Sequence, residues 1–457
     1  MRHEGGWSRM SHAMTAPKVF WGMFFYVLLA GLLLQKVVLP LTPWHAGHGL
    51  LAGGDWVGFH AAADQLAVLI EASGWGHWEL RPKGNAPIGI AAMLYALTGI
   101  HEVWVVLPVN AALYAMSAVL LWHGMRMLTL NPAVALAALL PMFLFPSAVM
   151  IWGQIHKDVW VLAGALGLVW GLVRLGHGAV PSLKTCAVLV VVAVVSMLLI
   201  WVMRLYANAI FFAASAIGVA VLAILLRPRG VTWWLAAGSF LLAQAAVIIF
   251  VAQTQTQTQT QTQTQTQTQT QTQTQTQTQT QTPVALCDIW QQQPPIPLLD
   301  NQLAGLACAR EGFRLGYPNA RSNIDTEVAF RNARDIASYV PRALQIALFA
   351  PFPDMWAGKA QQPGGVVQRL LAVPELILYY LALVGCVLAA VKSHSRERAI
   401  MAALVSFSLF YVLTYALVVT NIGTLYRMRY AAMLLLCALG MWGWSMVAQR
   451  NVNRVPI

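Results

Sequence analysis

Residues 19–39 read VFWGMFFYVLLAGLLLQKVVL, a nearly continuous apolar run of membrane-spanning length. A helix needs about 20 predominantly apolar residues to cross the ~30 Å hydrocarbon layer of a bilayer. Similar runs recur along the chain, which has 457 residues, 58% of them hydrophobic and 10% charged. Backbone groups in lipid must be satisfied within their own segment, so the pattern predicts an all-α polytopic membrane protein. The first run lacks a small-residue cleavage pattern after it, and we expect it to stay as a helix.

Ten transmembrane helices are predicted, of which residues 19–39 form the first. An even number places both termini on one side, and the Lys and Arg residues of the short inner connections predict that this side is the cytoplasm. Ala86 to Gly99 is apolar but short, which predicts a re-entrant or interfacial helix. The second to fifth spans cover about residues 103–125, 132–150, 159–173 and 184–203; the sixth ends before Arg227; the seventh to ninth cover about 231–252, 370–391 and 399–420; the tenth ends near Val447.

Composition divides the chain into four parts. The most unusual is a tract in which Gln-Thr repeats without interruption from Gln253 to Thr282. It has no apolar face to bury, which predicts a disordered spacer; an adhesive or polysaccharide-contacting strand is the alternative. The parts are an N-terminal transmembrane bundle (1–252) with a first outer loop (40–87), the Gln-Thr tract (253–282), a small extracytoplasmic cap (283–369) and the C-terminal transmembrane helices (370–457).

The formal net charge of +12 is explained by basic loops that orient helices against anionic lipid, so the bilayer and not nucleic acid is the expected partner. Cys287 and Cys308 share the cap, and they would form a disulfide if it faces an oxidising compartment. The sequence contains no Walker loop, dinucleotide fingerprint, zinc pattern or Gly-x-Ser-x-Gly elbow. It therefore predicts no cofactor and no metal ligand set, and leaves the use of a divalent metal open.

A layer of polar side chains is predicted on the outer side. Its first member stands in Gly53-Gly54-Asp55-Trp56-Val57-Gly58-Phe59-His60, where a carboxylate is flanked by aromatic rings and glycines. Ionisable groups near membrane depth are costly and commonly mark substrate pathways. For any one of them, a snorkelling cation or a satisfied helix end is the simpler explanation. The predicted members are Asp55, Arg81, Lys83, His156, Lys157, Asp158, Arg204, Asn208, Asp354, Asn421, Arg427 and Arg429.

Asp55 is the predicted general base, because a carboxylate at the membrane boundary can take a proton from a sugar hydroxyl while cations stabilise a departing lipid phosphate. The alternative is an N-cap for the helix that starts near Trp56. Asp158 is expected to pair with Lys157 or to cap the fourth span. His156 is expected to be a hydrogen-bonded turn residue, since no second histidine lies at ligand spacing. Asp354 is a second carboxylate candidate and Asn421 a further member. The predicted phosphate-binding cations are Arg81, Lys83, Lys157, Arg204, Arg427 and Arg429.

This pattern resembles the bacterial polytopic membrane glycosyltransferases of the GT-C type. A segment from Arg310-Glu-Gly-Phe through Pro351-Phe-Pro-Asp-Met-Trp356 also looks like one found in envelope-polysaccharide membrane proteins. The usual GT-C signature has an acidic partner next to the first-loop acid, whereas Asp55 stands alone. The residues that carry the GT-C resemblance are Asp55, the segment from Phe145-Pro146-Ser147 through Lys157-Asp158, and Asn421-Ile-Gly-Thr with Arg427 and Arg429.

The resemblance implies transfer of a sugar from a polyprenyl-phosphate-linked donor to an extracytoplasmic acceptor, with Asp55 as base and basic residues on the lipid phosphate. It also implies a bacterial inner-membrane location and other envelope polysaccharide synthesis proteins as partners. An O-antigen or exopolysaccharide polymerase or ligase, which would rely more on outer arginines, is the nearest alternative. A transporter predicts charges at mid-membrane depth, which the spans nearly lack. A non-catalytic membrane scaffold remains open.

Overall fold

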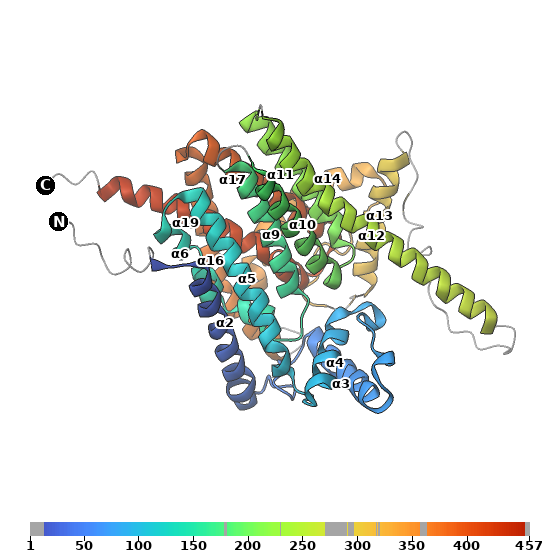
Figure 1. The fold of residues 1–457 in the computed structure, drawn as a ribbon. Helices are drawn as coiled ribbons and strands as arrows, with labels where there is room; N and C mark the ends of the chain where they lie inside the picture. Colours follow the sequence, from blue (N-terminus) through green and yellow to red (C-terminus); the bar gives the residue numbers. More distant parts are fainter. Residues whose placement is uncertain are drawn as a thin grey trace.

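The computed structural model describes residues 13–177, 181–228, 230–269, 290, 297–316, 318, 320–356 and 363–452. These residues form helices, joined by loops that contain two isolated β-bridges and no strand (Figure 1). Nine helices in this part of the chain are long and apolar enough to cross a membrane. The predicted all-α polytopic membrane protein is therefore confirmed.

The nine spanning stretches agree with the predicted spans within a few residues at most ends. The first, Ala16–Leu41, joins α2 (Ala16–Leu33) to η1 (Leu34–Val38) and η2 (Leu39–Leu41), and the second, Val103–Thr129, joins η5 (Val103–Val106) to α5 (Leu107–Thr129). The others belong to α9 (Asp158–Gly176), α10 (Leu183–Met203), α11 (Ala207–Leu226), α12 (Val231–Gln269), α16 (Pro363–Lys392), α17 (Ser395–Val418) and α19 (Tyr430–Val452).

The third predicted span, residues 132–150, is wrong as a continuous helix. The segment is broken into α6 (Pro132–Ala137), α7 (Leu140–Leu144) and α8 (Ser147–Trp152). Pro141 and Pro146 stand at the starts of α7 and α8, where proline is well tolerated, whereas inside a helix it removes an N–H donor and tends to kink or break the helix.

The broken segment nevertheless runs back along α5. It starts next to the last turn of α5, where the Asn131 side chain caps α6 by accepting from Ala133 N at 2.9 Å. It ends next to the first turn of α5, where Asn110 Nδ2 donates to Trp152 O at 2.8 Å. The alternation of direction in the predicted topology is therefore kept, with three short helices in place of one long one.

Two helices outside the spans pack together at one end of the bundle, at the lower edge of Figure 1. They are α3 (Asp55–Ser73) and α4 (Ala86–Thr98), and we call this end the α3–α4 end. Trp56 is buried between them and donates from Nε1 to Leu51 O at 2.5 Å. The predicted short helix at Ala86–Gly99 is thus present as α4, which is too short to span. At the opposite end, Arg396 Nε donates to Gly176 O at 3.1 Å.

The described part of the cap holds the turn before α18 (Ile422–Met428). It contains α13 (Pro297–Gly316), α14 (Ala333–Phe349) and α15 (Pro353–Trp356). Arg310, on α13, is buried and donates from Nη1 to Leu417 O at 3.0 Å. Ile324 N donates to Thr420 O, and Ile422 N to Ser322 O, both at 2.9 Å. These bonds fix the position at which α18 starts.

The Gln-Thr tract begins where the apolar part of α12 ends, at Gln253, and the backbone of α12 continues as a helix to Gln269. Residues 270–289 lie outside the described residues. The role of the Gln-Thr tract as a disordered spacer therefore stays a prediction.

Candidate functional site

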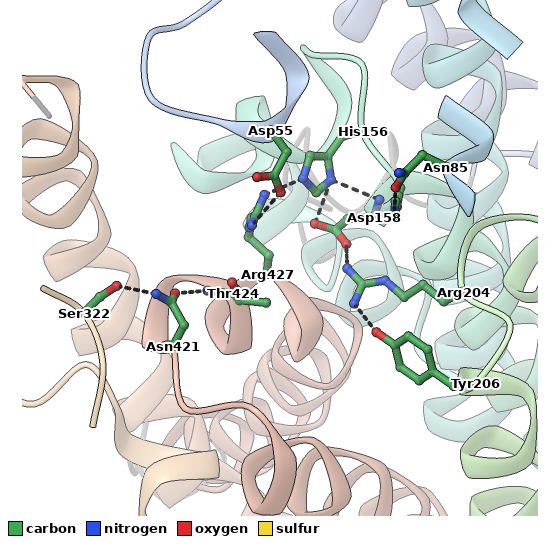
Figure 2. A network of polar contacts seen from close by, with 11 residues as sticks. Asp55, Asn85, His156, Asp158, Arg204, Tyr206, Ser322, Asn421, Thr424 and Arg427 are labelled. Carbon is green, nitrogen blue, oxygen red and sulfur yellow. Dashed lines mark hydrogen bonds and ion pairs between the residues drawn. The ribbon is translucent and has the colours of Figure 1, made fainter. Parts of the chain in front are cut away.

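Six of the predicted outer residues lie close together at the α3–α4 end, and all of them except Lys157 are labelled in Figure 2. We call them the polar cluster. They come from the start of α3, the loop between α8 and α9, the start of α9, the loop between α10 and α11, and the end of α18. The members are Asp55, His156, Lys157, Asp158, Arg204 and Arg427.

The loop that carries His156 is held from three sides. Gln35, buried in η1, donates from Nε2 to Gly153 O at 2.7 Å. Asn110 Nδ2 donates to Gln154 O at 3.0 Å, and Leu51 N donates to Gln154 Oε1 at 3.3 Å. Buried polar groups need such partners because an unmade hydrogen bond costs about 1–3 kcal/mol. The three bonds therefore fix the backbone from which the centre of the cluster projects.

A buried ion pair forms the base of the cluster. Asp158 is the first residue of α9, where a negative charge is favoured by the helix dipole. Its Oδ1 lies 2.5 Å from Nη2 of Arg204, and the two side chains are 5% and 8% exposed. Arg204 also donates from Nη1 to the Tyr206 hydroxyl at 3.3 Å. Asp158 therefore pairs with Arg204, whereas the sequence had suggested a pair with Lys157. Nor is Asp158 the N-cap of α9, because that position is occupied by Lys157.

His156 connects this pair to Arg427. Its Nε2 contacts Nη1 of Arg427, and its Nδ1 lies 2.9 Å from Oδ2 of Asp158. The ring also packs against Trp56, with centroids 5.7 Å apart. Burial lowers the pKa of His156, and the two nearby arginines lower it further, against the opposing effect of Asp158. His156 is therefore neutral, and it is a hydrogen-bonded loop residue, as predicted.

Asp55 and Arg427 bring the cluster to the surface. Arg427 Nη2 lies 3.7 Å from Oδ2 of Asp55, and the two side chains are 20% and 54% exposed. Asp55 is the first residue of α3, Gly54 is the N-cap, and no side-chain cap bond is present there. The N-cap alternative for Asp55 is therefore wrong. Its carboxylate faces Arg427 and the outside of the protein.

Lys157 adds a second cation near the surface. Its Nζ donates to Asn85 Oδ1 at 2.7 Å and lies 5.6 Å from the centre of the Phe59 ring. Burial lowers the pKa of Lys157, and Arg204 acts in the same direction. Its hydrogen-bond partner is a neutral amide, so its charge is not cancelled by a direct ion pair in the described structure.

The buried half of the cluster has little free space. A cavity of about 10 Å³ lies between Asp158, Arg204 and Tyr415. That volume holds about one water molecule. A substrate would therefore meet the cluster at Asp55, Lys157 and Arg427.

The remaining predicted cations lie elsewhere. Arg81 donates to the backbone carbonyls of Trp201 and Val202 and stacks over the Trp201 ring at 4.3 Å. Lys83 is exposed and has a left-handed backbone, with φ of 51°. Arg429 is buried, donates from Nη1 to Ala347 O at 2.8 Å, and faces α14. Arg427 and Arg429 are two residues apart, but the structure does not bring their side chains together on one site.

The other predicted members have structural positions away from the cluster. Asn421 caps α18, accepting from Thr424 N at 3.0 Å, and donates to Ser322 Oγ at 2.9 Å (Figure 2). Asn208 is buried at the start of α11. Asp354 is exposed in α15. Cys308 takes part in a disulfide, whereas Cys287 lies outside the described residues, so their pairing stays a prediction.

The sequence reasoning missed two polar residues that bond to this region, Asn85 and Glu375. Asn85 lies in the first outer loop and was assigned no role, because an amide that follows Gly84 resembles an ordinary turn residue. Glu375 is buried in α16 and accepts from Ser147 N at 2.5 Å and from the Tyr426 hydroxyl at 2.7 Å. A lone acid inside an apolar span was the signal for it. Among the described residues, no group of three or more His, Cys, Asp or Glu side chains is placed to hold a metal ion.

Comparisons with known proteins give little further information. No family model matches the chain, and no curated protein matches it. One similar solved structure is the archaeal oligosaccharyltransferase AglB from Archaeoglobus fulgidus, in complex with an inhibitory peptide and a dolichol-phosphate. The two have a TM-score of 0.43 and 12% sequence identity, and the match covers 96% of this chain and 52% of AglB. The chain thus spans about half the length of AglB. A likeness this distant says nothing about activity.

Proposed function

We propose that the chain is a membrane glycosyltransferase that moves a sugar from a polyprenyl-phosphate carrier to an acceptor outside the cytoplasm, in envelope glycan synthesis at the bacterial inner membrane. One observation supports this most directly. A half-exposed carboxylate, Asp55, stands beside the guanidinium of Arg427, with Lys157 on the adjoining loop at the same end of the bundle. An acid–base group next to cations is the arrangement that transfer from a phosphate leaving group requires.

The proposed step uses the surface residues of the polar cluster. The acceptor hydroxyl loses its proton to Asp55 as its oxygen bonds to the anomeric carbon of the donor sugar. The bond between that carbon and the phosphate oxygen breaks, and the lipid phosphate leaves with the electron pair. Arg427 and Lys157 stabilise the charge that develops on the phosphate, because they are held in place before the reaction by His156 and Asn85.

Charge balance indicates where the phosphate binds. With His156 neutral, the polar cluster has three cations and two carboxylates. Arg204 is taken up by Asp158, and Arg427 is only loosely paired with Asp55. The uncompensated positive charge therefore belongs to Lys157, whose partner is the amide of Asn85. An anion placed between Lys157 and Arg427 would complete the balance without displacing the buried pair.

Substitution of Asp55 by Asn tests the proposal. The change keeps the shape of the side chain but removes the base, and general-base catalysis typically contributes 10²–10⁴-fold. We expect transfer from a radiolabelled polyprenyl-phosphate sugar in proteoliposomes to fall by roughly 10²-fold or more. Asp64→Asn is the matched control, because Asp64 lies on the same helix, has a side chain that is 45% exposed, and contacts His101 at 2.6 Å instead of the cluster. Equal activity of the Asp55 variant and the wild type would contradict the proposal.

The same assay separates the nearest alternative. If Asp55→Asn kept its glycan products and Arg427→Ala lost them, the chain would instead be a polymerase or ligase of whole repeat units. If neither change altered the products while both proteins folded, the chain would have a non-catalytic or transport role.

A further inference from the structure

A chain of four polar side chains runs from the buried base of the cluster to its surface. Asp158 contacts the Nδ1 side of His156, and the Nε2 side of His156 contacts Arg427. Arg427 then reaches Asp55 with its other amino group, Nη2. The residues at the two ends of this chain differ in exposure, since Asp158 is buried and Asp55 is half-exposed. His156 thus lies between the fixed and the accessible parts.

The hydrogen-bond chemistry assigns the tautomer of His156. Arginine offers only donors, so Nε2 of His156 must accept from Arg427, and Nδ1 must carry the ring proton. Nδ1 lies 2.9 Å from Asp158 Oδ2, which makes that carboxylate the expected partner of the ring proton. The backbone N–H of Asp158 also lies 3.2 Å from Nδ1. If Nδ1 accepted that N–H, the ring proton would be on Nε2. Two N–H donors, from Nε2 and from Arg427, would then face each other.

We propose that His156 is a positioning residue, which holds Arg427 in the orientation that stabilises the leaving phosphate. This proposal rests on the proposed glycosyl transfer and assigns a role within it. Asp158 fixes the ring through Nδ1–H, and Arg204 fixes Asp158 from the other side. Arg427 is held through Nη1 by a neutral acceptor and keeps its Nη2 for the surface. A charged acceptor in place of His156 would instead cancel the guanidinium charge that the phosphate needs.

The arrangement makes the orientation of Arg427 dependent on pH. Protonated His156 has two N–H donors and no acceptor, so it would lose the bond to Arg427 and repel it. The charged groups that face the ring or its partners are Asp158, Arg427 and Arg204, with Lys157 next to it in the chain. Since burial lowers the pKa of His156 from its ordinary value of 6.5, the loss is expected only on the acid side of that value.

Three variants of the full-length protein in proteoliposomes test this role. In His156→Gln, the amide supplies a neutral acceptor for Arg427 and a donor for Asp158, and it does not titrate between pH 4 and 8. We expect its kcat/KM to stay within about threefold of the wild type at neutral pH and to lose the acid-side fall, about tenfold per pH unit, that His156 causes. His156→Leu should lose roughly 10²-fold at every pH, since it cannot orient Arg427. His60→Gln is the control, because His60 is also buried but bonds Tyr95 at 2.9 Å.

The proposal would be overturned if the pH profile of kcat/KM for His156→Gln superimposed on that of the wild type. It would also be overturned if His156→Gln folded but was as inactive as His156→Leu. A readout without activity covers variants that fail to fold. In ¹⁵N-histidine-labelled wild-type protein, assigned by comparison with Arg427→Leu, we expect His156 to be protonated at Nδ1 and unprotonated at Nε2 at neutral pH. The opposite tautomer would refute the role even if Asp55→Asn confirms the transferase. Full activity of Asp55→Asn would refute the transferase, and with it this role for His156, whichever tautomer is found.

Discussion

The Asp158–Arg204 pair permits a sharp prediction about stability. Both side chains are almost completely buried, and the pair is 2.5 Å long. Removing one partner of a buried ion pair typically costs about 3–5 kcal/mol, because the other charge stays buried without compensation. Asp158→Asn removes the negative charge that compensates Arg204 and leaves it neutral acceptors, the new amide oxygen and the Tyr206 hydroxyl at 3.3 Å, so we expect a loss near the upper end of this range. Arg204→Met leaves Asp158 with the ring proton of His156, so we expect a loss near its lower end.

The double variant Asp158→Asn/Arg204→Met is the decisive member of this cycle. It contains no buried uncompensated charge, so we expect it to be more stable than Asp158→Asn alone, within about 2 kcal/mol of the wild type. The free energy of unfolding is measured from tryptophan fluorescence as sodium dodecyl sulfate replaces a mild detergent. Additive losses in the double variant, or a loss below about 1 kcal/mol in Asp158→Asn, would refute the reasoning that the pair is dry and tightly coupled.

Two further predictions concern Lys157 and the packing of α16 on α19. Burial lowers the pKa of Lys157 below its ordinary value of 10.5, so Lys157 should lose its charge, and donor binding should weaken, at a pH below 10.5. A KM for the donor that rises at alkaline pH in the wild type but not in Lys157→Arg would confirm this. Gly443→Ala should cost about 3 kcal/mol or more, because the added Cβ would lie 1.8 Å from Gly385 O and backbone atoms cannot move aside. Gly238→Ala in α12, with nothing within 4 Å of the added Cβ, should have the same free energy of unfolding as the wild type in the fluorescence assay described above.

The spans were predictable because length and hydropathy determine what a bilayer accepts. The error at residues 132–150 came from using hydropathy without the prolines. The segment is apolar throughout, but Pro141 and Pro146 each start a new short helix. Apolar composition therefore predicted a helical segment that runs back along α5, and could not predict that it is broken into three short helices.

The candidate site was predictable as a set of residues but not as a set of contacts. Hydropathy places Lys157, Arg204 and Arg427 at span ends and Asp55 in the first outer loop, all on one side, which is why the layer was found. Which carboxylate meets which cation depends on helix packing between residues far apart in sequence. Arg427 and His156, for example, are 271 positions apart. The neighbouring Arg429 turns into the protein because it lies at the end of α18, next to the carbonyls of α14.

Exposure within the polar cluster decides how its variants should be interpreted. Asp158 and Arg204 are buried and bonded on several sides, so their loss changes the folded population before it changes a rate. Asp55 is half-exposed and its contact with Arg427 is long, at 3.7 Å, so its loss leaves the fold intact and changes only what the surface can do. His156 stands between the two groups, and its conservative replacement by Gln is the one change that separates orientation from stability. A loss of transfer in Asp158→Asn therefore identifies catalysis only after correction for folded protein, whereas a loss in Asp55→Asn identifies it directly.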